Sequence, residues 1–459
     1  MSDRGTVVGP ISGSADPRVA LVTYTTRPRG GPVHALRLGE ELHRLGYPVH
    51  LFALGDPDAG FFRDPEVPHT LIPAPTRAET LQDRVFEAAE ALAAGMAEAA
   101  AGFAIVHAED CIAATAALRI REAGARWRVL RTVHHVDDFT TPALIECQQR
   151  SIEGPDACLV VSAHWRDRLR QEYGIHAAVV RNGVDVERFD SVPPHLARAF
   201  RDRIGARDRF VFLTVGGIEP RKGSLELFEA LAALWNLDPP PLLAVVGGHS
   251  FQDHEAYRRT VFDRAEVLGL REGEDYVRLG TVTEAELPVA YAAADALAFP
   301  STKEGFGIVL LEALAAGLPV VTTDLPVFHE FLVPGRDALM VPAGDAAALA
   351  GAMSRLVREP ALRSSLAAAG PPVASRFPWA DTARAHVDVY RALAAGSVST
   401  PSEAATALRA SSESAHPSPT SMSAPEVSPT AATAHAAARP SSASPPTTAD
   451  TKACTGANT

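Results

Sequence analysis

Residues 300–323 read PSTKEGFGIVLLEALAAGLPVVTT and are the most informative stretch of this chain. The apolar run before them, Leu297–Phe299, predicts the end of a buried strand, and Ile308–Ala316 predicts a helix that Gly317 ends and Pro319 follows. A strand, a glycine-containing loop and a helix in this order are typical of parallel α/β sheets, whose ligands lie beyond the carboxyl ends of the strands. The segment therefore predicts a ligand site.

Two glutamates, Glu304 in the loop and Glu312 on the helix, enclose the hinge of this segment. Gly305 and Gly307 let the backbone approach a ligand, and the first free amides of the helix, those of Phe306–Ile308, point outward with the positive end of its dipole. This geometry suits a diphosphate. We interpret Glu304 as an acceptor for hydroxyls of a transferred sugar and Glu312 as an acceptor for ribose hydroxyls. The spacing alone would also fit two solvated charges beside a helix.

In this context, Glu-x7-Glu resembles the signature of the retaining glycosyltransferases of family 4, and further segments resemble that family in register over residues 18–396. The sequence VVRNGVDVERF at Val179–Phe189 is similar to the family's crossing between domains. The sequence FVFLTVGGIEPRKG at Phe210–Gly223 is similar to its phosphate-binding turn. Three further matching segments follow in the family's order: Val245–Gly248, Val277–Gly280 and Tyr291–Ser301. The resemblance implies transfer of a sugar from a nucleoside-diphosphate-sugar donor with retention at the anomeric carbon.

Short apolar strands alternate with helical stretches in both halves, which predicts two doubly wound parallel sheets. The expected strands are Val19–Thr25, Val49–Ala53, Ile105–Ala108, Val129–Val133, Cys158–Val161 and Val179–Arg181, then Phe210–Gly216, Leu242–Val246, Tyr276–Leu279, Ala296–Pro300, Val320–Thr322 and Ala338–Val341. The resemblance implies the α/β GT-B architecture, in which two Rossmann-like domains face a cleft.

The expected domain organisation has five parts. They are a flexible N-terminus (1–17), an N-terminal acceptor domain (18–190), a C-terminal donor domain (191–375), a helix that crosses back to the first domain (376–396) and a tail (397–459). The tail is rich in Ser, Thr, Ala and Pro and has no aromatic residue, so it cannot bury enough surface to fold, and we expect it to be disordered.

The phosphate-binding turn departs from the family pattern at one position. The family has Gly-Arg, four further residues and Lys, but here Gly217 stands in the place of the arginine, while Lys222 is present. Arg221 could supply the second positive charge from a different backbone position. Alternatively, both cations are surface charges on a turn. The resemblance implies that Arg221, Lys222 and the helix amides stabilise the charge on the leaving diphosphate.

In the first half, the sequence RPRGGPVHALRL at Arg27–Leu38 follows the first strand and opens a helix. Gly30 and Gly31 predict a turn whose backbone can approach the donor diphosphate or the acceptor, and we place Gly31 among the donor-binding residues. A glycine pair after a strand also fits an ordinary tight turn.

His134 resembles the active-site histidine of the family, at the end of the fourth expected strand, and would flank the transferred sugar. A buried structural histidine is the plainer alternative. A metal site made of His134, His135 and Asp137 or Asp138 is disfavoured, because adjacent side chains at a strand end point to opposite sides. We expect no metal, no cofactor and no covalent nucleophile.

Composition limits the partners. The chain has 459 residues and a formal net charge of −12, which disfavours nucleic acid as a partner. Four cysteines without metal-like spacing, no visible signal peptide and no long apolar segment predict a cytoplasmic protein. Five arginines face one acid, Glu122, over residues 119–131. They predict either a weak peripheral contact with an anionic membrane or, more simply, a solvated helix face.

The donor base and sugar do not follow from these motifs, although the base is expected near Gly280–Thr283. The acceptor, whether a small molecule, a glycan or a lipid, would depend on first-half loops such as Asp56–Arg77. Two other functions stay open. One is a sugar-nucleotide isomerase (epimerase) on the same fold. The other is a non-catalytic nucleotide-sugar binding protein, which the glycine in place of the family's arginine at position 217 favours.

Overall fold

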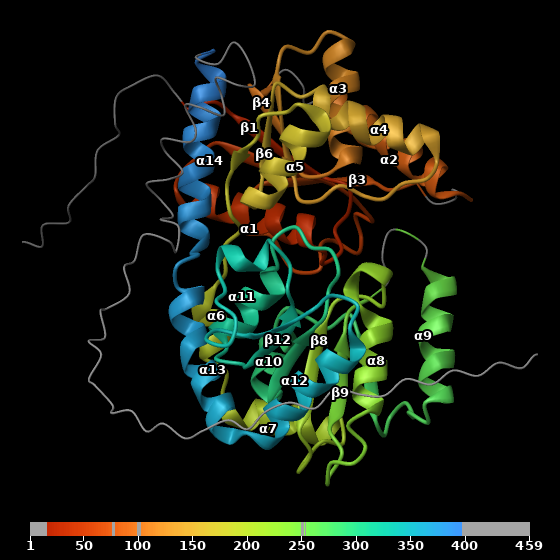
Figure 1. Cartoon of the computed structure of the whole chain (residues 1–459). Helices are drawn as coiled ribbons and strands as arrows, with labels where there is room; N and C mark the ends of the chain where they lie inside the picture. The colour runs from red at the N-terminus through yellow and green to blue at the C-terminus, as the bar shows by residue number, and fades with distance from the viewer. Residues whose placement is uncertain (1–15, 76–78, 99–101, 249–251, 253, 397–459) are drawn as a thin grey trace, which may run out of the picture. The chain divides into compact units, whose positions relative to one another are not determined.

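The computed structural model describes residues 16–75, 79–98, 102–248, 252 and 254–396 (Figure 1). The predicted tail, 397–459, lies outside the described residues, as does nearly all of the predicted N-terminal segment. The described strands form two separate sheets, and every strand pair in both is parallel. This confirms the predicted α/β class.

The first sheet has seven strands in the order β3-β2-β1-β4-β5-β6-β7. In chain order they are β1 (Val19–Thr23), β2 (Val49–Gly55), β3 (His69–Pro73), β4 (Ile105–Ala108), β5 (Arg128–Val133), β6 (Ala157–Val160) and β7 (Ala178–Val179). Strand β1 lies between β2 and β4, with Leu21 paired to Leu51 on one side and to His107 on the other. The strand order therefore reverses at β1, where a doubly wound sheet opens its ligand crevice.

The second sheet has six strands in the order β10-β9-β8-β11-β12-β13. They are β8 (Val211–Val215), β9 (Leu242–Val246), β10 (Tyr276–Gly280), β11 (Ala296–Phe299), β12 (Val320–Thr323) and β13 (Leu339–Val341). Here the order reverses between β8 and β11, so the loops after these two strands lie at the switch point.

Helices connect the strands. In the first half they are α1 (Gly30–Arg44), α2 (Leu81–Ala97), α3 (Cys111–Glu122), α4 (Pro142–Glu153), α5 (Ala163–Tyr173) and α6 (Val186–Asp190). In the second half they are α7 (Pro194–Arg203), α8 (Ser224–Ala232), α9 (Glu255–Val267), α10 (Glu286–Ala293), α11 (Ile308–Ala315), α12 (Ala346–Arg358), α13 (Pro360–Ala374) and α14 (Trp379–Ala394), with 3₁₀ turns at Pro220–Lys222 and Phe328–Glu330.

Alternation along the strands builds the core on both faces of each sheet. In β1, Val19 and Leu21 pack with residues of α1 and α14, whereas Ala20 and Val22 pack with residues of α2 and α3. The second sheet is covered in the same way, by α8, α9 and α12 on one face and by α7, α10 and α11 on the other. Burial on both faces explains why the strands read as continuous apolar runs.

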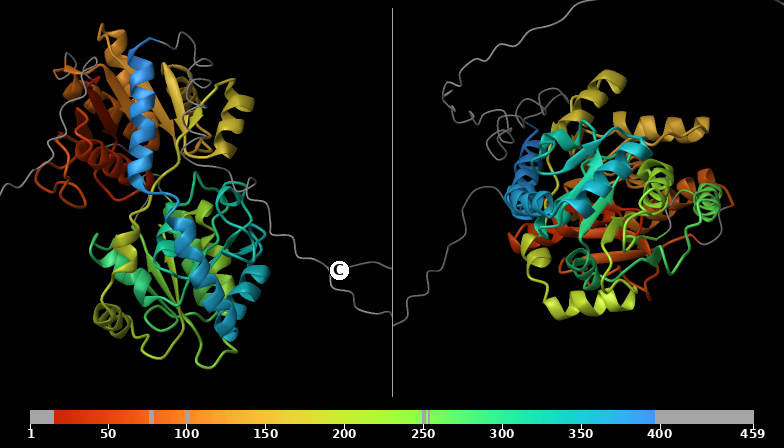
Figure 2. Two further views of the ribbon diagram at one scale, coloured as in Figure 1. Left: turned by 90° about the vertical axis from the view of Figure 1, so that its left-hand side faces the viewer. Right: turned by 60° about the horizontal axis from the view of Figure 1, so that its bottom comes forward.

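Helix α14 belongs to the core of the first sheet although it comes last in the described chain. Ala383, Val387 and Tyr390 are buried with Val19 and Leu21 of β1. The helix also packs against α1, and Figure 2 shows it running beside the strands of the first sheet. The domain boundaries expected from the sequence stay a prediction, but this contact is the kind that a returning helix would make.

One strand of the first sheet was not predicted. Strand β3, at the edge of the sheet, buries only Ile72 of its five residues. An edge strand with one solvent-facing side carries no apolar run, so the pattern used to find the other strands does not mark it. Its neighbour β2 pairs with it over five positions, including Leu54 with Ile72.

Candidate active site

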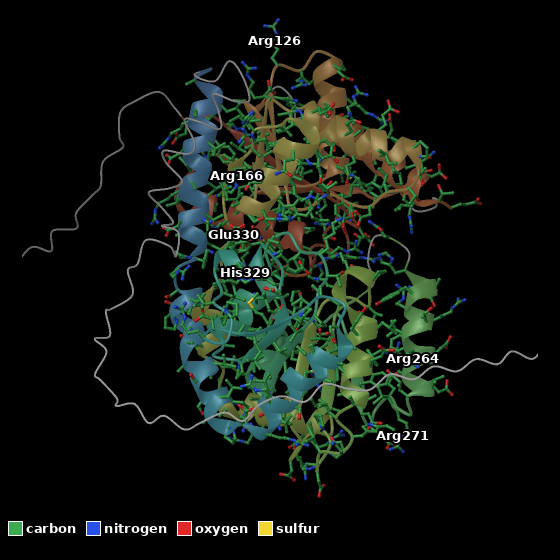
Figure 3. All side chains as sticks on the ribbon, in the orientation of Figure 1. Arg126, Arg166, Arg264, Arg271, His329 and Glu330 are labelled. Atoms are coloured by element: carbon green, nitrogen blue, oxygen red, sulfur yellow. The ribbon has the colours of Figure 1, made fainter. Side chains whose placement is uncertain are left out.

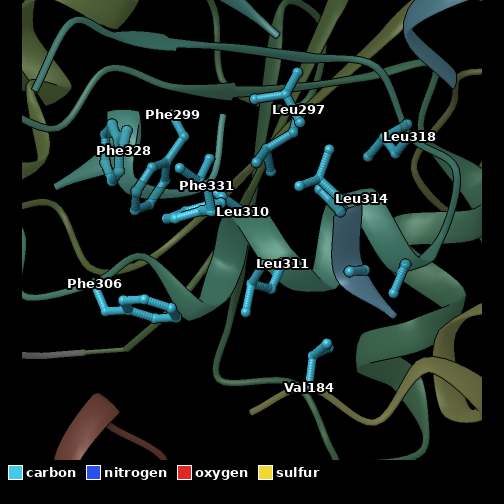
Figure 4. Packing of buried hydrophobic residues seen from close by; sticks show 14 of the residues in the cluster. Val184, Leu297, Phe299, Phe306, Leu310, Leu311, Leu314, Leu318, Phe328 and Phe331 are labelled. Atoms are coloured by element: carbon cyan, nitrogen blue, oxygen red, sulfur yellow. The ribbon is translucent and has the colours of Figure 1, made fainter. Parts of the chain in front are cut away.

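The loop between β11 and α11 is anchored by an aromatic side chain in the core. Phe306 is 1% exposed, and its ring centroid lies 5.2 Å from that of Phe331 and 5.8 Å from that of Phe377. Figure 4 shows Phe306 close to the start of α11, with Leu310 and Leu311 among the buried residues around it. Phe306 can therefore offer a ligand only its backbone amide.

Two glycines bring this loop against the first half of the chain. Gly307 caps α11 with a φ of 99°, which side-chain-bearing residues rarely adopt. A Cβ atom at Gly305 would lie 2.2 Å from the carbonyl oxygen of His134. The loop that carries Glu304 therefore passes directly against the end of β5, and two residues predicted from separate motifs are neighbours.

Glu304 is held from three sides. Its Oε1 lies 2.5 Å from Nζ of Lys222 and 3.6 Å from Nη1 of Arg221, and its carbonyl oxygen accepts a 2.9 Å hydrogen bond from Nε1 of Trp165. Burial would raise the pKa of the Glu304 carboxyl, but the charges of Lys222 and Arg221 outweigh it, so the pKa lies below its usual value. Glu304 is therefore an ionised acceptor between two cations.

The backbone around Gly217 is too close to its neighbours to accept the arginine that the family has at this position. A Cβ atom there would lie 2.7 Å from the carbonyl oxygen of Gly248 and 3.1 Å from Oε1 of Glu219, so a side chain does not fit without movement of the backbone. Glu219 is buried, and its Oε2 lies 3.0 Å from Nε of Arg221. The turn directs Arg221 toward the oxygen atom of Glu304 that Lys222 also contacts.

The two cations have different surroundings. Lys222 lies over the ring of Phe299, with Nζ 4.6 Å from the centroid. Burial lowers the pKa of Lys222, and Glu304 opposes this only in part. For Arg221, burial would lower the pKa, but Glu304 and Glu219 raise it above its usual value. Both side chains are cations, but burial lowers the pKa of Lys222, whereas the two acidic residues keep the pKa of Arg221 raised.

Glu312 lies one turn into α11 and has a very different environment. It is buried, and its Oε2 accepts a 2.7 Å hydrogen bond from the hydroxyl of Tyr291. Burial raises the pKa of Glu312 to about 7, and the bond from Tyr291 offsets only part of this effect. The two glutamates of the motif are therefore one ionised and one near its midpoint at neutral pH.

His134 lies at the start of a buried cluster in the first half. Its Nε2 is 2.9 Å from Oε2 of Glu109, which follows β4, and Nδ1 of His34, on α1, is 2.9 Å from the same oxygen. The side chains of His34 and Glu109 are fully buried, while that of His134 is 14% exposed. Neither Glu109 nor His34 is predicted from the sequence as a site residue. Glu109 directly follows β4, and His34 lies within the segment Arg27–Leu38 that follows β1.

The cluster continues inward to the last helix. His107 on β4 lies 2.8 Å from the hydroxyl of Tyr390 through Nδ1 and 2.7 Å from Oγ1 of Thr132 through Nε2. Burial lowers the pKa of His107 to about 4. His386 of α14, with its ring centroid 5.4 Å from that of His107, also has a pKa well below its usual value because it is buried. These inner histidines are neutral core residues.

Three side chains of this cluster, two imidazoles and a carboxylate, are of the types that bind metal ions. Of the residues that the structure describes, His34, Glu109 and His134 form a group whose possible ligand atoms lie within 4.8 Å of one another. Both contacts to Glu109 are, however, at hydrogen-bond distance, and Nε2 of His34 is buried with no hydrogen-bond partner among the residues that the structure describes. Metal-bound imidazoles usually donate their second nitrogen to an acceptor, so the hydrogen-bonded interpretation fits better.

The alternative metal set at His134, His135, Asp137 and Asp138 is not assembled. Nε2 of His135 lies 3.5 Å from Asp137, which also accepts a 2.9 Å hydrogen bond from the side chain of Gln252. Asp138 is paired with Lys303 at 2.7 Å. The two aspartates therefore connect the loop after β5 with residues of the second half.

The glycine pair of the first half forms the first turn of α1, whereas the sequence predicts a turn before the helix at these two residues. The helix begins at Gly30, and neither Gly30 nor Gly31 has a positive φ. A Cβ atom at Gly31 would lie 3.7 Å from the ring of His134, in ordinary contact. Gly31 thus lies beside His134, at a helix N-terminus.

The arginines of residues 119–131 are mostly paired. Arg119 contacts Glu90 at 2.7 Å, and Arg121 and Arg128 share Asp156 at 2.8 and 2.9 Å. Arg131 is buried and donates a hydrogen bond to the hydroxyl of Ser151. Figure 3 shows Arg126 pointing outward from the fold. These pairs favour the solvated helix face over a membrane contact.

In the described part of the chain, no helix is both long enough and apolar enough to cross a bilayer.

Comparison with known proteins identifies the family of the chain. Residues 28–188 match the family model described as Glycosyltransferase Family 4, and residues 198–371 match the one described as Glycosyl transferases group 1. The chain belongs to the family 4 glycosyltransferases.

Curated relatives include a D-inositol 3-phosphate glycosyltransferase of Corynebacterium urealyticum, 30% identical over 54% of this chain and 59% of the relative. A GDP-mannose-dependent alpha-(1-6)-phosphatidylinositol monomannoside mannosyltransferase of Mycolicibacterium smegmatis is 34% identical over 54% of this chain and 66% of the relative. The matches to these relatives thus span between about half and two thirds of their length.

Solved structures share the GT-B fold. A sucrose-phosphate synthase from Thermosynechococcus elongatus superposes with a TM-score of 0.68 at 24% identity, covering 83% of this chain and all of the other. The Anabaena protein HepE, solved in complex with UDP-glucose, gives a TM-score of 0.67 at 18% identity, again over 83% of this chain and all of the other. The predicted GT-B architecture is confirmed.

Proposed function

We propose that this chain is a retaining glycosyltransferase that transfers a sugar from a nucleoside-diphosphate-sugar donor to an acceptor. The observation that carries this proposal is the convergence of Lys222 and Arg221 on one oxygen of Glu304, beside the N-terminus of α11. Two cations, a carboxylate and free helix amides are the groups that a diphosphate linked to a sugar requires.

The roles divide by charge. As the bond between the sugar and the diphosphate breaks, negative charge grows on the leaving group, and Arg221, Lys222 and the amides of Phe306–Ile308 would stabilise it. Glu304 would orient the sugar through its hydroxyls, and Glu312 would accept from the ribose. The side chain of His134, next to the Glu304 loop, would contact the sugar from the opposite half.

Arg221 takes the place of the family's arginine in this proposal. Its support is that Nη1 of Arg221 lies 3.6 Å from Glu304, while the close approach of Gly217 to Gly248 leaves no room for a side chain at the usual position. The same turn geometry disfavours a degenerate site, since the second positive charge is present.

For the partners, the relatives offer candidates. Among them, one is named for its use of GDP-mannose, and others are named for inositol 3-phosphate or phosphatidyl-myo-inositol. HepE was solved with UDP-glucose. We propose a UDP- or GDP-sugar as the donor and an inositol-containing acceptor as the first class to try. The cytoplasmic location and the absence of a metal requirement stay predictions from the sequence.

The test is a thermal-shift screen of the full chain against UDP, GDP and ADP and their common sugars, because a ligand that binds only the folded state raises the melting temperature. A shift with one base identifies the donor class. That donor is then incubated with acceptors, and the anomeric configuration of the product is read by NMR. Conversion of the donor sugar without any acceptor would indicate an isomerase, and binding without turnover would indicate a binding protein.

A further inference from the structure

We propose that Glu109, supported by His34, is a positioning residue that holds His134 as the neutral tautomer protonated on Nε2, so that Nδ1 can accept a hydrogen bond from a hydroxyl of the donor sugar. This inference rests on the proposed function for the identity of the ligand. Glu109 and His34 form a buried pair for which the sequence predicts no role.

The first step is the protonation state of Glu109. Its side chain is fully buried, and burial would raise its pKa, but the neighbouring His34 and the hydrogen bonds from His134 and His34 hold the pKa well below the usual value. An ionised carboxylate only accepts hydrogen bonds. Both imidazole nitrogens that approach Oε2 at 2.9 Å must therefore carry protons, Nδ1 of His34 and Nε2 of His134.

The second step is the charge of His134. Burial lowers the pKa of His134, and the contact with Glu109 opposes this only in part. A neutral imidazole has one N–H and one lone pair. Because the proton is on Nε2, the lone pair is on Nδ1, and none of the described residues hydrogen bonds to that atom.

The third step is access. The side chain of His134 is 14% exposed, in contrast to the fully buried His34 and Glu109 behind it. The backbone of His134 touches Gly305, the residue after Glu304. His134 therefore lies between the buried carboxylate and the loop proposed to hold the sugar. A lone pair on Nδ1 suits a sugar hydroxyl as donor, whereas the other tautomer would present an N–H that cannot accept.

His34 acts on Glu109 and does not reach the ligand. Its ring meets that of His134 edge-on with centroids 5.0 Å apart, and its Nε2 is buried without a hydrogen-bond partner among the described residues. Among the described residues, the polar contact of its side chain is the Nδ1 proton donated to Glu109. An asparagine at position 34 could supply a similar donor, because its side-chain amide approximates the place of Nδ1, whereas leucine could not.

The tautomer is measured directly on the full chain without ligand. Histidine is labelled with ¹⁵N, the ring nitrogens are observed through their carbon-bound protons, and His134 is assigned by the signal that disappears in His134→Gln. We expect a protonated Nε2 and an unprotonated Nδ1 for His134, and a mixture of tautomers in Glu109→Ala. A protonated Nδ1 in the unmodified chain, or a signal that changes when EDTA is added and so reports a bound metal, would overturn the proposal.

Binding separates positioning from folding. With the nucleotide found in the screen and its sugar conjugate as probes, Glu109→Ala should weaken the nucleotide sugar about three- to tenfold and leave the free nucleotide unchanged. Glu109→Gln and His34→Asn should retain most of the affinity, whereas His34→Leu should follow Glu109→Ala. Equal weakening of both probes, or a Glu109→Gln variant as poor as Glu109→Ala, would contradict the proposal.

If Glu109→Ala does not fold, the tautomer in the unmodified chain and the pair of His34 variants still decide the outcome. If no nucleotide binds the unmodified chain, the proposed function fails, while the tautomer measured without ligand still shows whether Glu109 positions His134.

Discussion

The two sides of the site use opposite electrostatic arrangements. In the second half, Lys222, Arg221, Glu219 and Glu304 bring four charges together within hydrogen-bonding or ion-pair distance. In the first half, the buried carboxylate of Glu109 is held by the N–H groups of two imidazoles. The two cations can stabilise a ligand group whose negative charge grows during the reaction. Neutral N–H donors instead hold in place a group whose charge does not change.

The largest effect should come from the charged side. Replacing Lys222→Ala removes a buried cation beside Glu304 and should lower kcat/KM by about 10²- to 10³-fold, because stabilisation of the leaving group is lost. Lys303→Ala is the matched control, since Lys303 lies in the same loop as Glu304 but pairs with the exposed Asp138. Initial rates with the identified donor measure both. Similar losses in the two variants would remove the special role of Lys222.

Restoring the family's arginine should harm the fold rather than strengthen the site. In Gly217→Arg, the new Cβ would lie 2.7 Å from the carbonyl oxygen of Gly248, so the free energy of unfolding should fall by about 1–3 kcal/mol. Gly351→Arg is the control, because Gly351 is exposed on α12 with nothing within 4 Å of a Cβ atom. Urea unfolding compares them. An active Gly217→Arg variant of normal stability would show that Arg221 is not a replacement.

Glu312 should make donor binding depend on pH. Its carboxyl, with a pKa raised to about 7 by burial, becomes an ionised acceptor only above that pH, so affinity for the nucleotide sugar should rise up to about tenfold between pH 6 and pH 8. Glu312→Gln should bind independently of pH in this range. Titration calorimetry at several pH values is the measurement, and a flat profile in the unmodified chain would exclude a ribose contact that needs the carboxylate.

The raised pKa of Glu312 affects the stability of the fold in the opposite direction, because stability falls as the pH rises. The folded chain holds the proton of Glu312 more tightly than the unfolded chain, so this group's contribution is present at low pH and is lost as the pH rises from the ordinary carboxyl value through about 7. Without ligand, the melting temperature of the unmodified chain should therefore fall relative to that of Glu312→Gln over this range.

The smallest effect should come from the contact between the two sides. Trp165→Phe removes the hydrogen bond from Nε1 to the carbonyl oxygen of Glu304 and should reduce the free energy of unfolding by about 0.5–1.5 kcal/mol. Trp235→Phe, at a half-exposed position, should change it very little. Chemical unfolding measures both, and equal losses would show that the bond to Glu304 contributes nothing particular.

Most of the fold follows from the sequence because buried parallel strands leave continuous apolar runs. The strands Ile105–Ala108 and Leu242–Val246 are as predicted, and others differ by one or two residues. The half-exposed edge strand β3 leaves no such run.

The charged side of the site could likewise be predicted, since Glu304, Lys222 and Arg221 lie in loops directly after strands and carry their chemistry in their residue types. Their roles stay predictions. Glu109 and His34 could not be found in this way, because their function arises only when β4, β5 and α1 bring three side chains to one oxygen atom. The turn predicted at Gly30 and Gly31 lies inside the helix instead of before it, because α1 begins at the first glycine.

The return of α14 to the first sheet has a consequence for synthesis. Tyr390 packs against β1, and both Tyr390 and His386 contact His107 of β4. His107 precedes Tyr390 by 283 residues, and β1 emerges from the ribosome earlier still. Part of the apolar surface of the amino-terminal half therefore stays exposed to solvent until the last described helix has been translated. A nascent chain arrested before residue 379 should be a better client for chaperones than one arrested after residue 396.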